Sequence, residues 1–307
     1  MGKSTREAYG EALAALGAEN EKIVVMDADL SGSTKTGTFR KAFPDRFYNF
    51  GIAEADMVCA AAGFAFSGYI PFASTFAIFG TGRAYEQIRN TVAYTGANVK
   101  IACTHAGLSV GEDGGSHQAL EDISLMRTLP GMTVFVPCDA AEARKAVKAA
   151  VELQGPVYLR LSRPNTDDLT DESSPFIPGK ANVLRDGADA AIFATGLMVG
   201  TALKAAELLA QEGISAAVLN FHTLKPIDAE AILNYNGKVR AIVTAEEHFT
   251  VGGLGSAVAE VLAGHAGARF DRVGVEERFG QSGKPDDLFR EYGLTAENIA
   301  ARVKALL

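Results

Sequence analysis

Two histidines and an aspartate stand close together in THAGLSVGEDGGSHQALED, residues 104–122, which we call the glycine-rich loop. The side chains of His105, Asp113 and His117 can bind a metal ion, exchange protons with a substrate or hydrogen-bond its hydroxyl groups. Glycine permits backbone angles that other residues resist, so a dense run of it indicates an unusual chain path or a ligand near the backbone. Three interpretations follow: a solvated surface loop, a metal or nucleophile site, or a loop that faces a cofactor.

The spacing favours neither a metal site nor a serine nucleophile. His105, Asp113 and His117 match no short ligand motif, so we expect no metal ligands here. GLSVG, residues 107–111, has the G-x-S-x-G pattern in which a nucleophilic serine, here Ser109, stands on a sharp turn that runs straight into a helix. EDGGSH follows instead, and its two glycines are poor helix formers.

Hydrophobic periodicity predicts an α/β fold with a parallel sheet in each half of the chain. In the first half we expect strands at 22–26, 98–103, 132–137 and 156–161, and helices at 1–16, 53–66, 82–94 and 140–153. In the second half we expect strands at 188–196, 214–221, 239–247 and 272–277, and helices at 198–213, 252–264 and 295–307. The glycine-rich loop follows a predicted strand, at the edge where open parallel sheets carry their ligands.

A segment at 164–180 is rich in Pro, Asp, Ser and Thr and shows neither helical nor strand periodicity. We interpret it as an interdomain linker. We therefore divide the chain into a first α/β domain at 1–165, a linker at 166–181 and a second, smaller α/β domain at 182–307.

Composition excludes several classes of protein. The 307 residues carry a net charge of -8, which argues against a nucleic-acid surface but leaves anionic substrates open. No signal peptide is visible, and no apolar run approaches membrane-spanning length. Cys59, Cys103 and Cys138 form neither a disulfide framework nor a metal knuckle. We expect a cytoplasmic protein with no nucleic-acid or membrane partner.

Four separated segments, in the right order, resemble the transketolase family of thiamine diphosphate enzymes. FYNFGIAEADMVCAAAGFAFSGYIPFASTFAIF, residues 47–79, is similar to the pyrimidine-binding domain, and residues 104–139 are similar to the substrate loop of that domain. LRLSRPN, residues 159–165, resembles an arginine-bearing segment, and residues 277–307 resemble the carboxyl-terminal domain. The resemblance implies a pyrimidine-binding (transketolase central) domain followed by a transketolase carboxyl-terminal domain.

The resemblance implies that Glu54, Phe76 and Phe79 bind the pyrimidine ring of thiamine diphosphate. Glu54 would hydrogen-bond a ring nitrogen and promote the tautomer that takes a proton from the thiazolium ring, and Phe76 would stack on the ring. Phe79 matches less closely, because AIFGTGRAYEQ departs from the familiar forms in length and composition. From local pattern alone, Glu54 is interpreted as an acid that stabilises the first turn of a helix, and Phe76 as a core side chain.

The resemblance also implies that the glycine-rich loop binds the substrate. His105 and His117 would bind the sugar and shuttle protons as catalytic groups, while Asp113 would accept a hydrogen bond from a sugar hydroxyl. The glycines would let the loop pass close to the reactive carbon.

Three further residues match phosphate contacts of the family. Arg163 presents a fork of donors that suits a sugar phosphate, and Arg6 and Ser31 stand where further contacts are expected. Read alone, the two arginines are surface charges and Ser31 is a turn residue.

The Mg2+-binding sequence of the family, GDG followed by an asparagine, does not occur in the chain. The resemblance therefore implies the carboxyl-terminal subunit of a split transketolase, active only with an amino-terminal partner that carries the diphosphate-binding domain and the Mg2+ ligands. We expect a homodimer of this chain within a heterotetramer that transfers a ketol unit between sugar phosphates. The pentose phosphate pathway and branched-sugar catabolism both stay open.

Several alternatives remain at this point. Deoxyxylulose-phosphate synthases and 2-oxo-acid dehydrogenase beta subunits are relatives, although His105 before GEDGGSHQ is more typical of transketolases. A catalytically silent assembly subunit is the non-enzyme alternative. A serine hydrolase that uses Ser109 is a more distant one.

Overall fold

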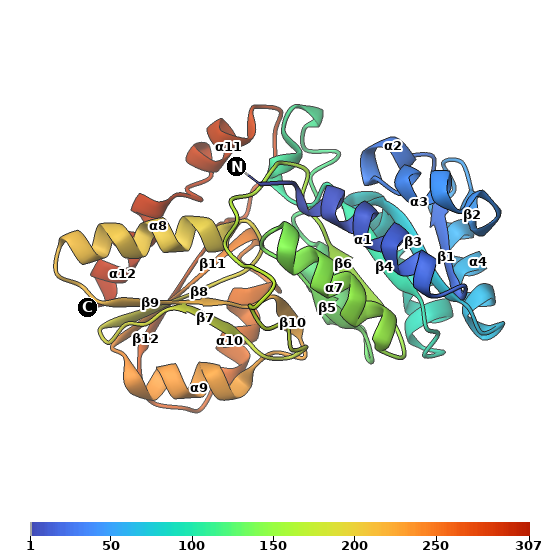
Figure 1. Ribbon diagram of the computed structural model, residues 1–307. Helices are drawn as coiled ribbons and strands as arrows, with labels where there is room; N and C mark the ends of the chain where they lie inside the picture. The colour runs from blue at the N-terminus through green and yellow to red at the C-terminus, as the bar shows by residue number, and fades with distance from the viewer. Residues whose placement is uncertain (1) are drawn as a thin grey trace.

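The computed structural model describes residues 2–307 and contains two α/β units that lie side by side (Figure 1). The strands are β1 (Ile23–Asp27), β2 (Phe47–Asn49), β3 (Ile70–Phe76), β4 (Lys100–Thr104), β5 (Thr133–Phe135), β6 (Val157–Arg160), β7 (Asn182–Arg185), β8 (Ala190–Ala194), β9 (Ala216–Asn220), β10 (Thr223–Lys225), β11 (Ala241–Phe249) and β12 (Arg269–Val275). Within the described residues no helix combines the length and apolar character that a membrane span needs.

Helices connect most of the strands. The α-helices are α1 (Thr5–Glu19), α2 (Ser31–Thr34), α3 (Gly37–Ala42), α4 (Glu54–Phe66), α5 (Tyr85–Gln87), α6 (Asp122–Arg127), α7 (Ala140–Glu152), α8 (Met198–Gln211), α9 (Ala229–Lys238), α10 (Leu254–Leu262), α11 (Pro285–Glu291) and α12 (Ala296–Leu306). The 3-10 turns are Pro44–Arg46 and Leu108–Asp113, and the π-helical turns are Ile78–Arg83 and Ile88–Ala93.

The first sheet has seven strands in the order β10-β5-β6-β4-β3-β1-β2, and all are parallel except β10. Alternate residues of β1 enter different cores: Ile23 packs with α1 and α7, whereas Val24 packs with α4. The register of β3 and β4 pairs Phe76 with Thr104. This pairing places the end of β3 beside the start of the glycine-rich loop.

The second sheet has five strands in the order β12-β11-β8-β9-β7, and all are parallel except β7. Helices α8 and α12 cover one face, and α9 and α10 cover the other. One buried apolar cluster includes Val134 of β5 and Leu224 of β10 together with Phe193 and Tyr235 of the second unit. The two units therefore share a core.

The linker 166–181 contains no helix or strand, and the first unit holds it in place. The carboxylate of Asp139 accepts hydrogen bonds from the backbone N–H groups of Leu169 and Thr170, at 2.9 and 2.5 Å. Further along the chain, β10 returns to the first sheet and pairs with β5. The division expected from the sequence does not include this return, because a three-residue edge strand has too short a pattern to recognise.

The single helix predicted at 82–94 is wrong in detail. The chain is helical there, but α5 stands between two π-helical turns. Ala84, Ile88 and Val92 are fully buried at intervals of four residues, longer than one α-helical turn. One face of this helical segment therefore enters the core.

Candidate active site

The predicted site residues lie at the carboxyl edge of the first sheet. Phe76 is the last residue of β3, and His105 directly follows β4. Ser31 begins α2 after β1, Glu54 begins α4, and Arg163 lies beyond the end of β6. The carboxyl ends of parallel strands meet at one edge, where open α/β sheets bind ligands. The predicted position of the glycine-rich loop is confirmed, while the roles of these residues stay predictions.

Four aromatic rings form one cluster at this edge. The rings of Phe76 and His105 are stacked, with centroids 3.9 Å apart and an angle of 24° between their planes. Phe76 also stacks on Phe79 at 5.7 Å, and Phe79 meets His117 edge-on at 5.3 Å. The structure therefore brings the two predicted cofactor phenylalanines against the two predicted substrate histidines.

His105 is held as a neutral imidazole. Its ring is buried, and its Nδ1 lies 2.8 Å from the Thr104 hydroxyl. Burial lowers the pKa of His105 to about 3, and nearby cations add to the effect: Arg6, Arg163 and Lys35. Its backbone adopts the left-handed conformation with φ of 58°, which costs a non-glycine residue about 1–2 kcal/mol. A strained, buried and uncharged histidine at a sheet edge is typical of a functional site.

Glu54 is paired with an arginine that the sequence did not single out. Its carboxylate is buried at the start of α4 and lies 3.1 Å from Nη1 of Arg83, whose side chain is half-exposed. The same guanidinium lies over the ring of Phe79, 4.1 Å from its centroid. Arg83 therefore joins the predicted carboxylate to the predicted aromatic platform. The only signal for it was its place in the segment that departs from the familiar forms.

Arg163 reaches into the glycine-rich loop. It donates a hydrogen bond to the carbonyl of Val110, and its Nη1 lies 3.8 Å from the carboxylate of Asp113 and 3.9 Å from that of Glu112. These two ion pairs are long and partly exposed, so they leave the guanidinium able to bind another anion.

Arg6 joins this cationic group from α1. It donates to the carbonyl of Arg163 at 3.2 Å and to the carbonyl of Ser33 at 3.0 Å. Burial is the largest influence on Arg6 and lowers its pKa. Its contact in the α2 turn is the carbonyl of Ser33, and the predicted role of Ser31 as a phosphate contact stays a prediction. Lys35, at the end of α2, adds a cation that the sequence analysis missed.

Four glycines of the loop also let it approach the second domain closely. A Cβ added to any of them would meet the second domain: Glu247 Oε1 at 2.3 Å from Gly107, Pro285 Cδ at 3.3 Å from Gly111, Ser282 Oγ at 2.5 Å from Gly114 and the Gly280 carbonyl at 2.5 Å from Gly115. Figure 1 shows α11, in red, beside this loop. The close approach that these glycines allow is therefore to the second domain.

Ser109 does not have the setting of a nucleophile. It is buried in the 3-10 turn Leu108–Asp113, and its hydroxyl donates to the carbonyl of Ala106 at 3.4 Å. The strand–turn–helix context that the G-x-S-x-G pattern requires is missing. The hydrolase alternative has no support.

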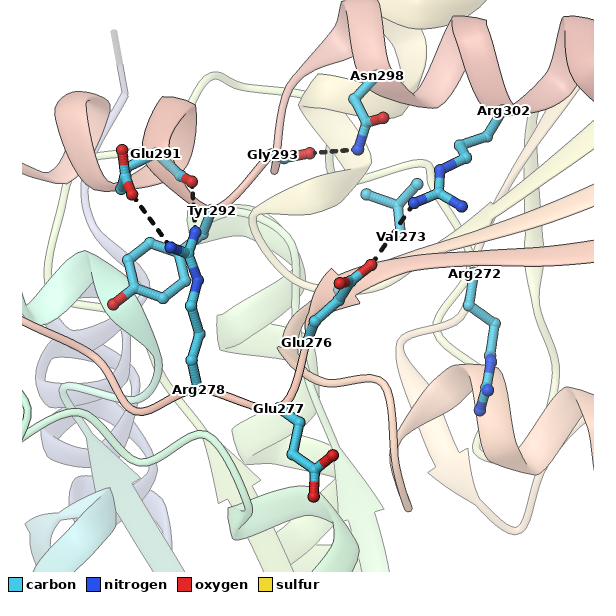
Figure 2. Close-up of a pocket in the computed structure, with 11 residues that line it drawn as sticks. Arg272, Val273, Glu276, Glu277, Arg278, Glu291, Tyr292, Gly293, Asn298 and Arg302 are labelled. Atoms are coloured by element: carbon cyan, nitrogen blue, oxygen red, sulfur yellow. Dashed lines mark hydrogen bonds and ion pairs between the residues drawn. The ribbon is translucent and has the colours of Figure 1, made fainter.

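A separate charged hollow of about 580 Å³ lies between β12, α11 and α12 (Figure 2). Two of its arginines are already paired with carboxylates: Arg278 with Glu291 at 3.0 Å, and Arg302 with Glu276 at 3.6 Å. The third, Arg272, donates to the carbonyl of Thr250 at 2.8 Å. The residues that line it include none of the predicted site residues. Across residues 2–307, no group of three His, Cys, Asp or Glu side chains is arranged to hold a metal ion.

Comparison with protein families and relatives agrees with this geometry. Residues 1–168 match the family described as transketolase, pyrimidine binding domain, and residues 179–299 match transketolase, C-terminal domain. A protein of Methanocaldococcus jannaschii named as a transketolase C-terminal section is 48% identical, over 98% of this chain and 95% of the relative. A 6-deoxy-6-sulfo-D-fructose transketolase subunit of a Clostridium species is 43% identical, over 96% of this chain and 91% of the relative.

Among solved structures, the chain is similar to a split-gene transketolase described as an inactive beta4 tetramer. The TM-score is 0.93 with 52% sequence identity, and the match covers 100% of this chain and 99% of that one. Both domains, their order and the whole fold therefore agree with one family, whose enzymes depend on thiamine diphosphate. The chain belongs to the transketolase family.

Proposed function

We propose that this chain is the carboxyl-terminal subunit of a split transketolase. With thiamine diphosphate and an amino-terminal partner, it transfers a two-carbon ketol unit between sugar phosphates. The observation that carries the proposal is the meeting of Glu54, Phe76 and Phe79 with His105 and His117 at one sheet edge. The buried carboxylate and the stacked rings suit an aminopyrimidine. The neutral and acidic hydrogen-bonding groups next to them suit a sugar bound alongside it.

The residues present fit the pyrimidine part of the cofactor. The Glu54 carboxyl would hydrogen-bond a ring nitrogen, the stacked Phe76 and Phe79 would present an aromatic surface to the ring, and Arg83 would fix the position of the carboxyl. When bound, thiamine diphosphate supplies the carbon nucleophile that accepts the ketol unit.

The loop residues would handle the sugar. The Nδ1 of the neutral His105 is paired with the Thr104 hydroxyl, so its Nε2 would exchange a proton with a sugar oxygen. His117, on the other side of the aromatic cluster, would also exchange a proton with the sugar. Asp113 would accept a hydrogen bond from a hydroxyl. Arg163 and Arg6 would bind the terminal anion, with Ser31 nearby as a weaker candidate.

We further propose that the Mg2+ diphosphate group is held by the partner subunit, within a heterotetramer built on a homodimer of this chain. The names of the relatives support the split of the enzyme into subunits, since they describe a C-terminal section, a subunit and a split gene. The three cysteines are unpaired, which fits a reducing cytoplasm.

The test is to assay ketol transfer by the purified chain with thiamine diphosphate and Mg2+, with and without the amino-terminal subunit. Xylulose 5-phosphate and 6-deoxy-6-sulfo-D-fructose are offered as separate donors, because arginines bind phosphate and sulfonate alike. We expect transfer only with both subunits present. Full activity of this chain alone would contradict the split arrangement, and no transfer from either donor would contradict the proposed reaction.

A further inference from the structure

The second domain holds the glycine-rich loop from two sides. On one side, β11 contributes the N–H of Phe249, which donates to the carbonyl of Leu120 at 2.8 Å. On the other, the segment before α11 accepts a hydrogen bond at the Gln281 carbonyl from Gln118 at 3.0 Å, and Pro285 packs on Gly111. The candidate site thus depends on a domain that contributes no predicted site residue.

Glu247 of β11 is a second-domain side chain that reaches into the loop. It is 3% exposed, and its Oε1 accepts a hydrogen bond from the backbone N–H of Ser109 at 2.5 Å. The same carboxyl fills the space beside Gly107, where a Cβ would lie 2.3 Å from Oε1. Ser109 stands in the 3-10 turn that ends at Asp113. One buried carboxyl therefore fixes the turn between two predicted substrate residues.

An ion pair of the first domain fixes Glu247 in turn. Arg160 donates to the backbone carbonyl of Glu247 at 2.9 Å and to the carboxylate of Asp122 at 2.7 Å. Tyr158 donates to the same Asp122 oxygen at 2.6 Å. Asp122 is the last residue of the glycine-rich loop, so the loop is anchored at its middle and at its end by groups that share Arg160.

We propose that Glu247 is a positioning residue for the active site: its carboxyl holds the Ser109 turn and thereby sets His105, Asp113 and His117 against the substrate. It touches neither substrate nor cofactor and acts only through the loop. Its effect on catalysis rests on the function proposed above, whereas its hold on the loop does not.

The charge of this carboxyl makes the hold sensitive to pH. Burial raises the pKa of Glu247 to about 7, while Arg160 and the Ser109 N–H oppose the rise and Asp122 adds to it. Above that pH the ionised carboxylate still accepts a charge-assisted hydrogen bond from Ser109, but the cost of burying its charge is larger, since the net shift of the pKa is upward. Lifting the loop would hydrate the carboxyl and lower its pKa toward the ordinary value, so the held loop binds the proton more tightly than the open one. We expect the loop to loosen as the pH rises through 7.

Two variants separate the hydrogen bond from the charge. Glu247→Gln keeps an acceptor of the same shape, and Glu247→Ala removes it. Glu246→Gln is the matched control, because Glu246 is an equally buried neighbour that accepts from the N–H groups of Leu254 and Gly255 at the start of α10. Hydrogen exchange of loop peptides in the full chain is the first measurement, at pH 6 and pH 8 after correction for intrinsic rates.

We expect Glu247→Ala to speed exchange in residues 106–120 about tenfold or more at pH 6, where the parent carboxyl holds the loop most firmly, and to leave the first sheet protected. Glu247→Gln should keep most of the protection but lose its dependence on pH, and Glu246→Gln should match the parent in the loop. Unchanged loop exchange in Glu247→Ala, or a pH dependence that survives in Glu247→Gln, would overturn the proposal.

The second measurement is steady-state transfer by the chain in complex with its partner. A misplacement of about 1 Å can cost about a hundredfold in rate, so Glu247→Ala should lower kcat about 10–100-fold and change KM less. Glu247→Gln should restore most of kcat and flatten the alkaline side of the pH profile near 7. If the parent complex has no activity, only the proposed function is contradicted. If Glu247→Ala exchanges faster in the loop but keeps its kcat, only the positioning role is contradicted.

Discussion

The carboxyl edges of the two sheets have the same architecture but different chemistry. At the first edge, His105 is buried and uncharged, and Arg163 reaches Asp113 only at 3.8 Å. At the second edge, Glu246 is fully bonded to the start of α10 by bonds of 2.7 and 2.8 Å, and Arg278 is paired with Glu291 at 3.0 Å. These charged groups at the second edge already have partners within the fold.

The carboxyl edge of a parallel sheet is therefore a possible place for a binding site, but the side chains at that edge decide whether a site forms there. The second domain uses its polar groups to close its own helix ends and to hold the loop of the first domain. The first domain leaves arginines, histidines and an acid with spare hydrogen-bonding capacity. Substitutions at matched positions of the two edges should therefore have unequal effects on activity.

The largest effect is expected from the acids at the two helix starts. Glu54→Gln should lower ketol transfer by about a hundred- to ten-thousand-fold, because a proton-relay carboxyl is lost while the side chain keeps its shape. Glu246→Gln should cost about 1 kcal/mol of stability and leave kcat near that of the parent. Steady-state kinetics of the complex measures both, and near-normal turnover in Glu54→Gln would remove that residue from catalysis.

The second largest effect is expected from arginines, one at each edge, whose removal should change KM unequally. Arg163→Ala should raise KM for phosphorylated sugars about 10–100-fold, since a hydrogen bond between charged groups contributes about 1.5–3 kcal/mol, and should affect unphosphorylated sugars far less. Arg278→Ala, in the hollow of Figure 2, should leave both KM values unchanged. An equal rise for both kinds of sugar would show that Arg163 does not bind the phosphate.

Glycine substitutions test the contact between the domains. In Gly115→Ala the new methyl group would lie 2.5 Å from the Gly280 carbonyl, so the loop or the segment before α11 must shift. We expect a loss of about 1–3 kcal/mol in the free energy of unfolding. The control is Gly63→Ala in the exposed part of α4, where no atom lies within 4 Å, and it should stabilise by about 0.5–1 kcal/mol. Denaturant titration compares them, and equal midpoints would argue against a tight loop contact.

The smallest effect concerns two buried histidines. The pKa of His105 is lowered to about 3 and that of His222, in the second half, to about 4, both mainly by burial. The unfolded chain binds the proton first as pH falls below about 6.5, so each histidine contributes stability at neutral pH that is lost toward its folded pKa.

Between pH 6.5 and 5 we expect the loss from each histidine to be about 1.5 kcal/mol, which His105→Asn or His222→Asn should remove. Asparagine suits position 105 because it tolerates the left-handed backbone. Only His105→Asn should also lower ketol transfer. Thermal melting across this pH range, with an assay of each variant, checks both points, and a parent whose stability is constant there would contradict the neutral state of His105.

Much of the fold was predictable from local pattern. The buried strands β1, β4 and β8 and the helices α4, α7 and α8 form where the periodicity indicated, because runs of apolar residues of fixed period are complete within a few residues. The short edge strands β2, β7 and β10 were not predicted, since three or four residues carry too little pattern.

The sequence by itself determined the chemistry of the site: a glycine-rich loop after a buried strand, with two histidines and an acid, and motifs in a fixed order. Only the tertiary structure decided that Arg83 meets Glu54, that Arg6 contacts Ser33 and that Glu247 holds the Ser109 turn. Ser109 and Glu247 are separated by 138 positions. Contacts over such distances follow from how two sheets pack, and packing depends on the shape of the whole core, which no local pattern records.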